Sequence, residues 1–407
     1  MTIRRSISKT WRRADRNLGG LHGMMCAAVY CAGAVGLNGC AKPAGPIFEP
    51  LATPIDWPGP PDTPRIHYVG QLSTTVDLKA GKSLGESLHE TFFGKQAVMG
   101  VVSPVAVERD DRDRLFVADN GGRVVHVFDL DKRRYEQWSP APPNRFISPV
   151  GLARAGDGRL FVADSAASLI WVFDAKGANI DAWGQEVLVR PCGMAFDDDA
   201  GQLLVADAGA HQVVIFDTGG QPLARLGSRG SAPGFFNFPV DVALDHEKRL
   251  YVSDSLNCRI QQFVLESRGG GASGLGRDKT ATGLGSDGTV RSQGDSYVPR
   301  LQIGSRGDMP GYFSRPKGIA VDSQDHLYVI DANFEAVQVY SSDGVLLMAF
   351  GREGRGPGEF WLPAGIHIDG TDRLWIADTY NRRVQVFDYR APTPESNQPS
   401  ASGEVSP

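Results

Sequence analysis

The residues best suited to bind a metal are the histidines, because neutral imidazole is a common zinc ligand. The sequence has eight of them, at positions 22, 67, 89, 126, 211, 246, 326 and 367. Zinc needs three or four converging ligands, and no such set is evident. His367 is the one candidate ligand, because it replaces the alanine of an otherwise similar phrase, Gly-Ile-Ala-Val-Asp, at residues 318–322. We expect no metal and no cofactor, and a packed or solvated histidine at position 367.

Aspartates recur at the ends of similar apolar segments, each followed by Asn, Ser, Ala or Thr. They are Asp119, Asp164, Asp207, Asp254, Asp331 and Asp378. An aspartate at the start of a turn usually accepts hydrogen bonds from backbone N–H groups, so we predict structural roles for them. A second recurring set is interpreted in the same way: Asp197, Asp245, Asp322 and Asp369. No Ser/His/Asp arrangement stands out, so no catalytic residue is predicted and a non-enzymatic protein is favoured.

Basic, aromatic and amide side chains gather in the turns and loops near these aspartates. The predicted ligand-binding residues, expected on one rim of the fold, are Arg123, His211, Asn257, Arg259, Lys317, Phe334, Tyr380, Arg382 and Arg383. Such a patch suits an anionic or protein ligand. The alternative is that these side chains cap turns and pair with neighbouring acids.

The elements that position these residues come from an internal repeat. The six recurring aspartates are separated by 45, 43, 47, 77 and 47 residues. The leading prolines, at positions 104, 149, 191, 239, 316 and 363, are separated by 45, 42, 48, 77 and 47 residues. Each copy contains short apolar strands with turn signals between them. Three or four strands in about 45 residues is typical of a propeller blade, which buries both faces against its neighbours.

The repeated phrase resembles the NHL repeat, and residues 65–388 resemble a six-bladed NHL β-propeller of the kind found in bacterial lipoproteins. Linkers that fit this resemblance run from Gly227 to Phe236, from Gly304 to Phe313 and from Gly351 to Phe360. The resemblance implies an all-β fold. A related family with this fold, the peptide-amidating lyases, binds zinc through channel histidines, but no three-histidine set maps onto this sequence.

Closure of the ring is predicted from the two ends of this region. The sixth repeat lacks a fourth strand, whereas residues 65–73 are similar in pattern to the fourth strands of other repeats. We therefore expect this N-terminal strand to complete the last blade and remove an exposed edge. Between it and the first repeat, Ser83 and Glu86 form a capping box for one short α-helix.

The 77-residue step indicates a normal blade with an insertion. Residues 267–296 are polar and glycine-rich, and we predict that they are disordered. They fall between the third and fourth strands of the fourth blade. Cys192 and Cys258 are expected near the same rim of neighbouring blades. Two separate thiols are favoured, although a disulfide stays open.

The N-terminus indicates export. Six bases against one acid precede a short apolar stretch in residues 1–39, which is typical of a signal peptide. Leu37-Asn38-Gly39-Cys40 resembles a lipobox, so Cys40 is the predicted lipidation site. Residues 40–64 are predicted to be a proline-rich tether and residues 389–407 a disordered tail. Ala41 favours the periplasmic side of the outer membrane if the cell is Gram-negative.

The predicted function is an exported, lipid-anchored binding or scaffold module. Its expected partner is a protein, a peptide or a cell-envelope polymer, and the chain is expected to be a monomer. The alternative is a metal-dependent lyase or hydrolase with a site at the channel mouth. Nucleic acid is not an expected partner, because residues 40–407 contain 36 Lys and Arg against 46 Asp and Glu.

Overall fold

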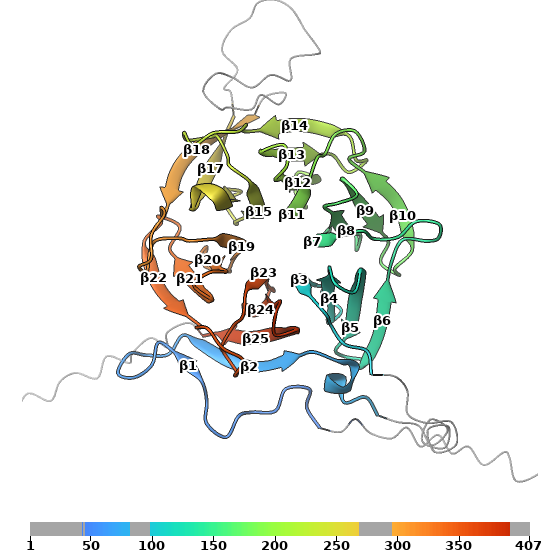
Figure 1. The fold of residues 1–407 in the computed structure, drawn as a ribbon, viewed down its shortest axis with the longest axis vertical. Coiled ribbons are helices and arrows are strands. Elements are labelled where there is room, and N and C mark those ends of the chain that lie inside the picture. Colours follow the sequence, from blue (N-terminus) through green and yellow to red (C-terminus); the bar gives the residue numbers. More distant parts are fainter. Residues whose placement is uncertain (1–42, 44, 82–97, 268–294, 391–407) are drawn as a thin grey trace, which may run out of the picture. The chain divides into compact units, whose positions relative to one another are not determined.

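Six antiparallel β-sheets are arranged as the blades of a propeller in the computed structural model (Figure 1). The structure describes residues 43, 45–81, 98–267 and 295–390. All of them lie in one compact unit of the chain, Pro43–Gly81 together with Lys95–Pro407. The prediction of an all-β, six-bladed fold is confirmed.

Each of the first five blades is a run of four consecutive strands. Blade one contains β3 (Pro104–Arg109), β4 (Arg114–Asp119), β5 (Val124–Asp129) and β6 (Arg134–Trp138). Blade two contains β7 (Pro149–Arg154), β8 (Leu160–Asp164), β9 (Leu169–Phe173) and β10 (Asn179–Trp183). Blade three contains β11 (Pro191–Asp197), β12 (Gln202–Asp207), β13 (Gln212–Phe216) and β14 (Pro222–Leu226).

The second half of the ring follows the same order. Blade four contains β15 (Pro239–Leu244), β16 (Leu250–Asp254), the 3₁₀ turn η2 (Ser255–Asn257), β17 (Arg259–Ser267) and β18 (Asp295–Ile303). Blade five contains β19 (Pro316–Val321), β20 (Leu327–Asp331), β21 (Ala336–Tyr340) and β22 (Leu346–Phe350). Blade six contains β23 (Pro363–Ile368), β24 (Arg373–Asp378) and β25 (Arg383–Tyr389), with β1 (Asp56–Trp57) and β2 (Ile66–Leu72) on its outer edge. A second 3₁₀ turn, η1 (Thr75–Leu78), follows β2.

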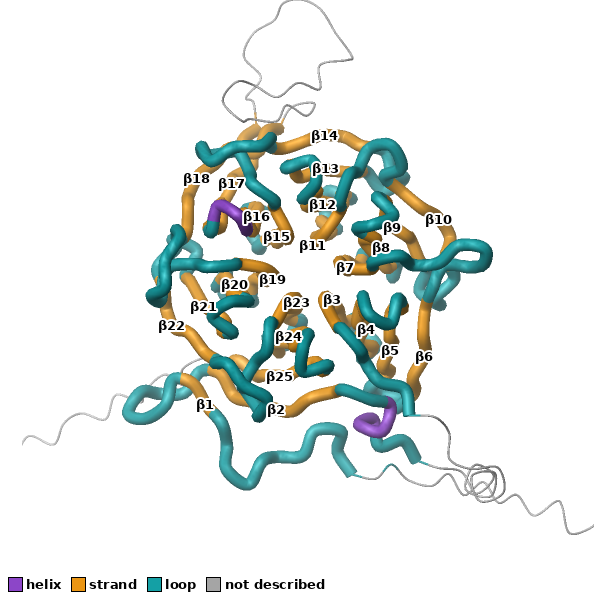
Figure 2. Tube along the Cα trace, viewed as in Figure 1, coloured by secondary structure: helices purple, strands orange, loops and turns teal. Residues whose placement is uncertain are grey.

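The first strand of every blade begins at its leading proline and lies at the centre of the ring. Strands β3, β7, β11, β15, β19 and β23 each contact the next in this order, and β23 contacts β3 (Figure 2). Apolar side chains fill the space between blades. For example, Leu204 and Val213 of blade three share a core with Val242 and Leu250 of blade four. Burying each such side chain contributes about 1.5–3 kcal/mol.

The N-terminal strand closes the ring, as predicted. Strand β2 pairs with β25 in antiparallel register, with Tyr68 opposite Phe387. The edge is covered further than predicted, because β1 pairs with the outer side of β2. The Trp57 ring packs 5.9 Å from the Phe387 ring.

Part of the predicted tether is also in contact with blade six, which corrects the interpretation of residues 40–64 as a spacer. The Phe48 ring lies 6.2 Å from that of Trp375, and Ile47 and Phe48 pack against the core between blades six and one. Burial of these apolar side chains outweighs the preference of a proline-rich segment for an extended, solvated form.

Several predictions concern residues that the structure does not describe. These are the signal peptide, Cys40, the short α-helix and the tail beyond residue 390. The insertion interrupts blade four between its third and fourth strands, as predicted, and the flanking strands stay paired out to Ser267 and Asp295. Cys192 and Cys258 are separate thiols. The described part of the chain contains no helix with the length and apolarity needed to span a membrane.

Candidate functional site

The two rims of the propeller differ in the loops that form them. We call one the proline rim: it carries the loops that lead into the first strands and the turns between second and third strands. The opposite rim carries the turns between first and second strands and those between third and fourth strands. Each leading proline is paired with the recurring aspartate of its own blade, as Pro104 is with Asp119, so both mark the proline rim.

The recurring aspartates have the structural role predicted for them. Asp119 accepts hydrogen bonds from the backbone N–H of Gly122 in its own turn, at 2.7 Å. It also accepts from Val102 and Ser103, at 2.5 and 3.0 Å, in the loop that precedes the first strand. Equivalent bonds from this loop recur in all six blades. Each aspartate therefore fixes a loop of the proline rim.

This fixed loop leaves apolar side chains at the surface. The residue two positions before the leading proline has its N–H bound by the aspartate, and in the first three blades it is Val102, Ile147 or Val189. These side chains are 49%, 47% and 57% exposed. In blade six the same position is Trp361, whose ring lies 5.5 Å from that of the exposed Tyr380. The proline rim thus carries an exposed apolar side chain at this position in blades one to three, and an aromatic pair in blade six.

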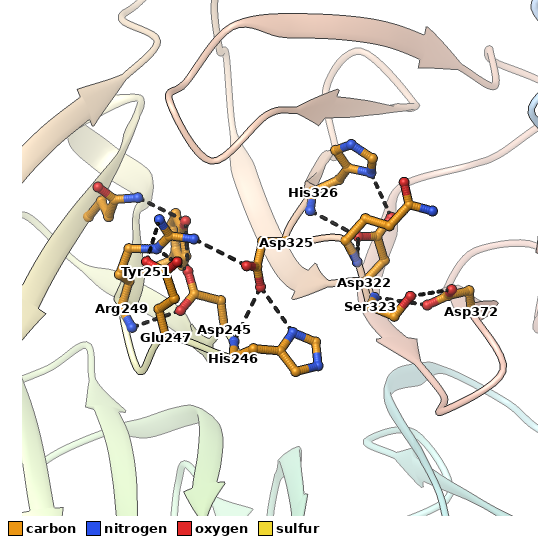
Figure 3. A network of polar contacts seen from close by, with 12 residues as sticks. Asp245, His246, Glu247, Arg249, Tyr251, Asp322, Ser323, Asp325, His326 and Asp372 are labelled. Carbon is orange, nitrogen blue, oxygen red and sulfur yellow. Dashed lines mark hydrogen bonds and ion pairs between the residues drawn. The ribbon is translucent and has the colours of Figure 1, made fainter. Parts of the chain in front are cut away.

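Charged side chains of the opposite rim, in contrast, make contacts between blades. Figure 3 shows Asp325 of blade five beside His246 and Arg249 of blade four. At the next interface the Ser323 hydroxyl donates to Asp372, at 2.7 Å (Figure 3). Every blade interface has such a contact: Arg154–Asp111, Gly156–Asp198, Lys248–Asp197, Arg249–Asp325, Ser323–Asp372 and Arg109–Asp369. This rim therefore holds neighbouring blades together.

Two of the predicted rim residues are not surface groups, which corrects their assignment to a ligand-binding patch. Arg259 and Arg383 are only 4% and 5% exposed. The Arg259 Nε lies 2.8 Å from Asp254, and that of Arg383 lies 2.8 Å from Asp378. Each guanidinium also donates to backbone carbonyls of the loop that precedes its blade. These arginines therefore fix the long linkers that contain Phe236 and Phe360.

The other predicted rim residues fall into two groups. Asn257 and His211 are half-buried and bonded to the loops: the Asn257 amide donates to Gly230, and His211 Nδ1 accepts from the N–H of Phe238. Phe334 and Lys317 are half-buried. Arg123, Tyr380 and Arg382 are exposed. The alternative, in which these residues cap turns, therefore holds for some of the set.

The central channel runs between the six first strands, and its lining extends from one rim to the other. Its cavity has a volume of about 620 Å³ and is lined by residues of all six first strands. Arg190, Arg315 and Lys317 line it at the end near the proline rim. Sequence reasoning selected Lys317 but missed both arginines, which directly precede the leading prolines of blades three and five. Burial, and then the neighbouring Arg315, lower the pKa of Lys317.

Asp241 is a channel residue that sequence reasoning also missed. It is the third residue of β15, where the other blades have Ala106, Gly151, Gly193, Gly318 or Gly365. Its carboxylate accepts from the N–H groups of Ile319 in the next blade and of Val242, each at 2.9 Å. Burial raises the pKa of Asp241 to about 7. An alignment of the repeats with one another would have revealed this exception.

His367, on the innermost strand β23, lines the channel. Its Nδ1 lies 3.4 Å from Glu108, and its Nε2 is buried without a hydrogen-bond partner in the described structure. Among the described residues, no three His, Cys, Asp or Glu side chains are grouped so that they could hold a metal ion. His367 and Glu108 therefore supply at most two ligands, fewer than zinc requires.

Two family models match the sequence. One, described as a 6-bladed beta-propeller, matches residues 301–400, and the other, described as an NHL repeat, matches residues 236–263. An E3 ubiquitin-protein ligase, NHLRC1 of Rattus norvegicus, is 33% identical over 81 residues. That segment is 20% of this chain and 20% of the relative. The chain thus matches only a fifth of the length of the curated relatives.

Solved structures share the fold at low sequence identity. An auxiliary nutrient binding protein from Bacteroides thetaiotaomicron has a TM-score of 0.51 at 13% identity, over 71% of this chain and 70% of the other. One from Bacteroides ovatus has the same TM-score and identity, over 72% and 71% of the two chains. At this identity the likeness concerns the fold alone.

Proposed function

Since this chain is a six-bladed β-propeller with NHL repeats, we propose that it is a binding module that recognises its ligand with the proline rim. The expected ligand is a protein, a peptide or a cell-envelope polymer. The observation that carries this proposal is the difference between the rims. The opposite rim has a polar contact at every blade interface, whereas the proline rim holds exposed apolar groups on fixed loops.

The exposed groups of the proline rim have the character of an interface. Arg355 lies over the Trp361 ring at 4.6 Å, and the Tyr380 ring packs against the same ring at 5.5 Å. Tyrosine, tryptophan and arginine dominate binding energy at protein interfaces. The Asn381 amide donates to the Gly354 carbonyl of this loop at 2.9 Å and helps to fix it. This arrangement orders the aromatic group before a ligand arrives, which lowers the entropy cost of binding.

The cellular part of the proposal rests on the sequence. We propose that the chain is exported and anchored through Cys40, on the periplasmic side of the outer membrane if the cell is Gram-negative. Replacement of Cys40 by serine should then move the protein from the membrane fraction to the soluble fraction and abolish incorporation of a labelled fatty acid. Continued labelling of this variant would contradict the anchor.

Photo-crosslinking in intact cells tests the rim. A photoreactive phenylalanine at position 380 should yield discrete crosslinked products, because this position is exposed beside Trp361. The matched control is position 247 on the opposite rim, where the glutamate side chain is 68% exposed. Equal products from both positions, or none from position 380, would overturn the proposal.

The structural neighbours support a binding role at the level of the fold. Both Bacteroides proteins are described as nutrient binding proteins. The alternative, a metal-dependent lyase or hydrolase, has no comparable support, because His367 and Glu108 supply too few ligands.

A further inference from the structure

The channel end at the proline rim carries an excess of positive charge. Arg190, Arg315 and Lys317 all line the cavity there, and none of them has an ion-pair partner within the described ranges. On the opposite rim, by contrast, Arg249 and Lys248 contact two or more carboxylates each. The three channel cations therefore differ from the cations that hold the fold together.

Lys317 has the least ordinary environment of the three. It lies on the innermost strand of blade five and is half-buried. An ammonium group withdrawn from water without a counter-ion lowers the stability of the protein. Arg315, two residues away, adds repulsion. This arrangement does not stabilise the fold. A bound anion would offset both the lost hydration of the ammonium group and its repulsion by Arg315.

The acids of the channel do not neutralise this end. Glu108 lines the cavity beside His367, 3.4 Å away, at the end of β3 that faces the opposite rim. Asp241 is nearer, but its two oxygens accept hydrogen bonds from backbone N–H groups and make no ion pair in the described structure. Burial also raises the pKa of Asp241 to about 7, so that a large share of it is uncharged at neutral pH.

We propose that the channel binds a small organic molecule through a carboxylate or phosphate group held by Arg190, Arg315 and Lys317. This inference goes beyond the proposed function of the rim, because it assigns a second site and names the chemistry of one ligand group. A cavity of about 620 Å³ falls within the usual range for small-molecule sites. Val105, Val150 and Val240 line the same space and contact the uncharged part of the ligand. A guanidinium group can donate two parallel hydrogen bonds to either a carboxylate or a phosphate.

Matched pairs of probes test the charge requirement. We would titrate the purified full chain with glucose 6-phosphate and glucose, and with succinate and succinamide, by calorimetry at low ionic strength. The anionic member of at least one pair should bind, and its neutral counterpart should not. Binding of glucose 6-phosphate alone identifies a phosphate ligand, and binding of succinate alone a carboxylate ligand. Equal binding of charged and neutral members would overturn the inference.

Variants locate the site. Lys317→Gln and Arg315→Gln should each weaken anion binding about tenfold or more, since each removes a hydrogen bond from a charged group. Arg315 is exposed, so its replacement leaves the fold intact even if that of Lys317 does not. Arg300→Gln is the matched control, because Arg300 is an exposed cation on the outer strand β18. Equal weakening in the control would show non-specific attraction and overturn the site.

The failure of this inference can be told apart from failure of the proposed function. If none of the probes binds but position 380 still gives crosslinks, the anion site is wrong and the rim interface stands. If an anion binds with the expected variants but position 380 gives no crosslink, the channel site stands and the rim interface is wrong.

Discussion

Replacement of Asp241 by asparagine isolates the cost of a half-buried carboxylate in the channel wall. The side chain stands between β15 and β19 and accepts two backbone hydrogen bonds. Its pKa of about 7 in the folded protein compares with about 3.9 in an unfolded chain. Asparagine has nearly the same shape and no charge, so the variant removes the titration and little else.

The sign of the effect follows from proton uptake. Below about pH 4 both states hold the proton, and the carboxyl group has no pH-dependent effect. Between about pH 4 and 7 the folded state retains the proton that the unfolded state has lost, so the wild type loses about 1.4 kcal/mol per pH unit. Above about pH 7 the loss is constant, on the order of 4 kcal/mol.

Denaturant unfolding at several pH values measures this difference. The free energy of unfolding of Asp241→Asn minus that of the wild type should rise by roughly 4 kcal/mol from pH 4 to pH 8. The asparagine side chain has only one acceptor oxygen, so its NH2 group faces one of the two backbone N–H donors. This contact between two donors costs about 1–3 kcal/mol. This offset is the same at every pH and leaves the slope unchanged. A difference that stays flat across this range would refute the reasoning.

Two further predictions concern stability. Arg383→Met leaves the buried Asp378 carboxylate without its ion-pair partner and should lower the free energy of denaturant unfolding by about 3–5 kcal/mol. Arg382→Met, at the exposed neighbouring position, should change the free energy of unfolding by about 0.5 kcal/mol or less. Similar losses in both variants would contradict the buried pair. Gly193→Ala should lower the melting temperature, because its Cβ would lie 2.8 Å from the Cα of residue 241 in the next blade. Gly370→Ala, with no heavy atom within 4 Å of the added Cβ, should leave it unchanged, and an equal shift in both would contradict the close approach.

The repeat explains why so much of the fold could be predicted. A blade must bury both faces against its neighbours, so its strands are apolar and recur at a constant period. Prolines and aspartates mark the same two points in each copy, at the start of the first strand and at the end of the second. Even the closing strand was predictable, because the sixth repeat lacked the strand that residues 65–73 could supply.

Side-chain roles on the rim were less predictable. Arg382 and Arg383 are adjacent in the sequence, yet one is exposed and the other is buried against Asp378. Arg382 lies in the turn before β25 with a left-handed backbone, whereas Arg383 is the first residue of the strand. The long linkers before blades four and six supply carbonyls for the buried Arg259 and Arg383. The packing of Phe48 on Trp375 depended in the same way on a surface that only the closed ring creates.

Local spacing by itself determined the number of blades, the order of their strands, the place of the insertion and the strand that closes the ring. These features depend on contacts within one repeat or between equivalent repeats, and such contacts leave a periodic pattern. Which charges are paired was decided by the tertiary structure alone. Arg190 belongs to blade three, Asp241 to blade four, and Arg315 and Lys317 to blade five, and only the closed ring places all four around one channel.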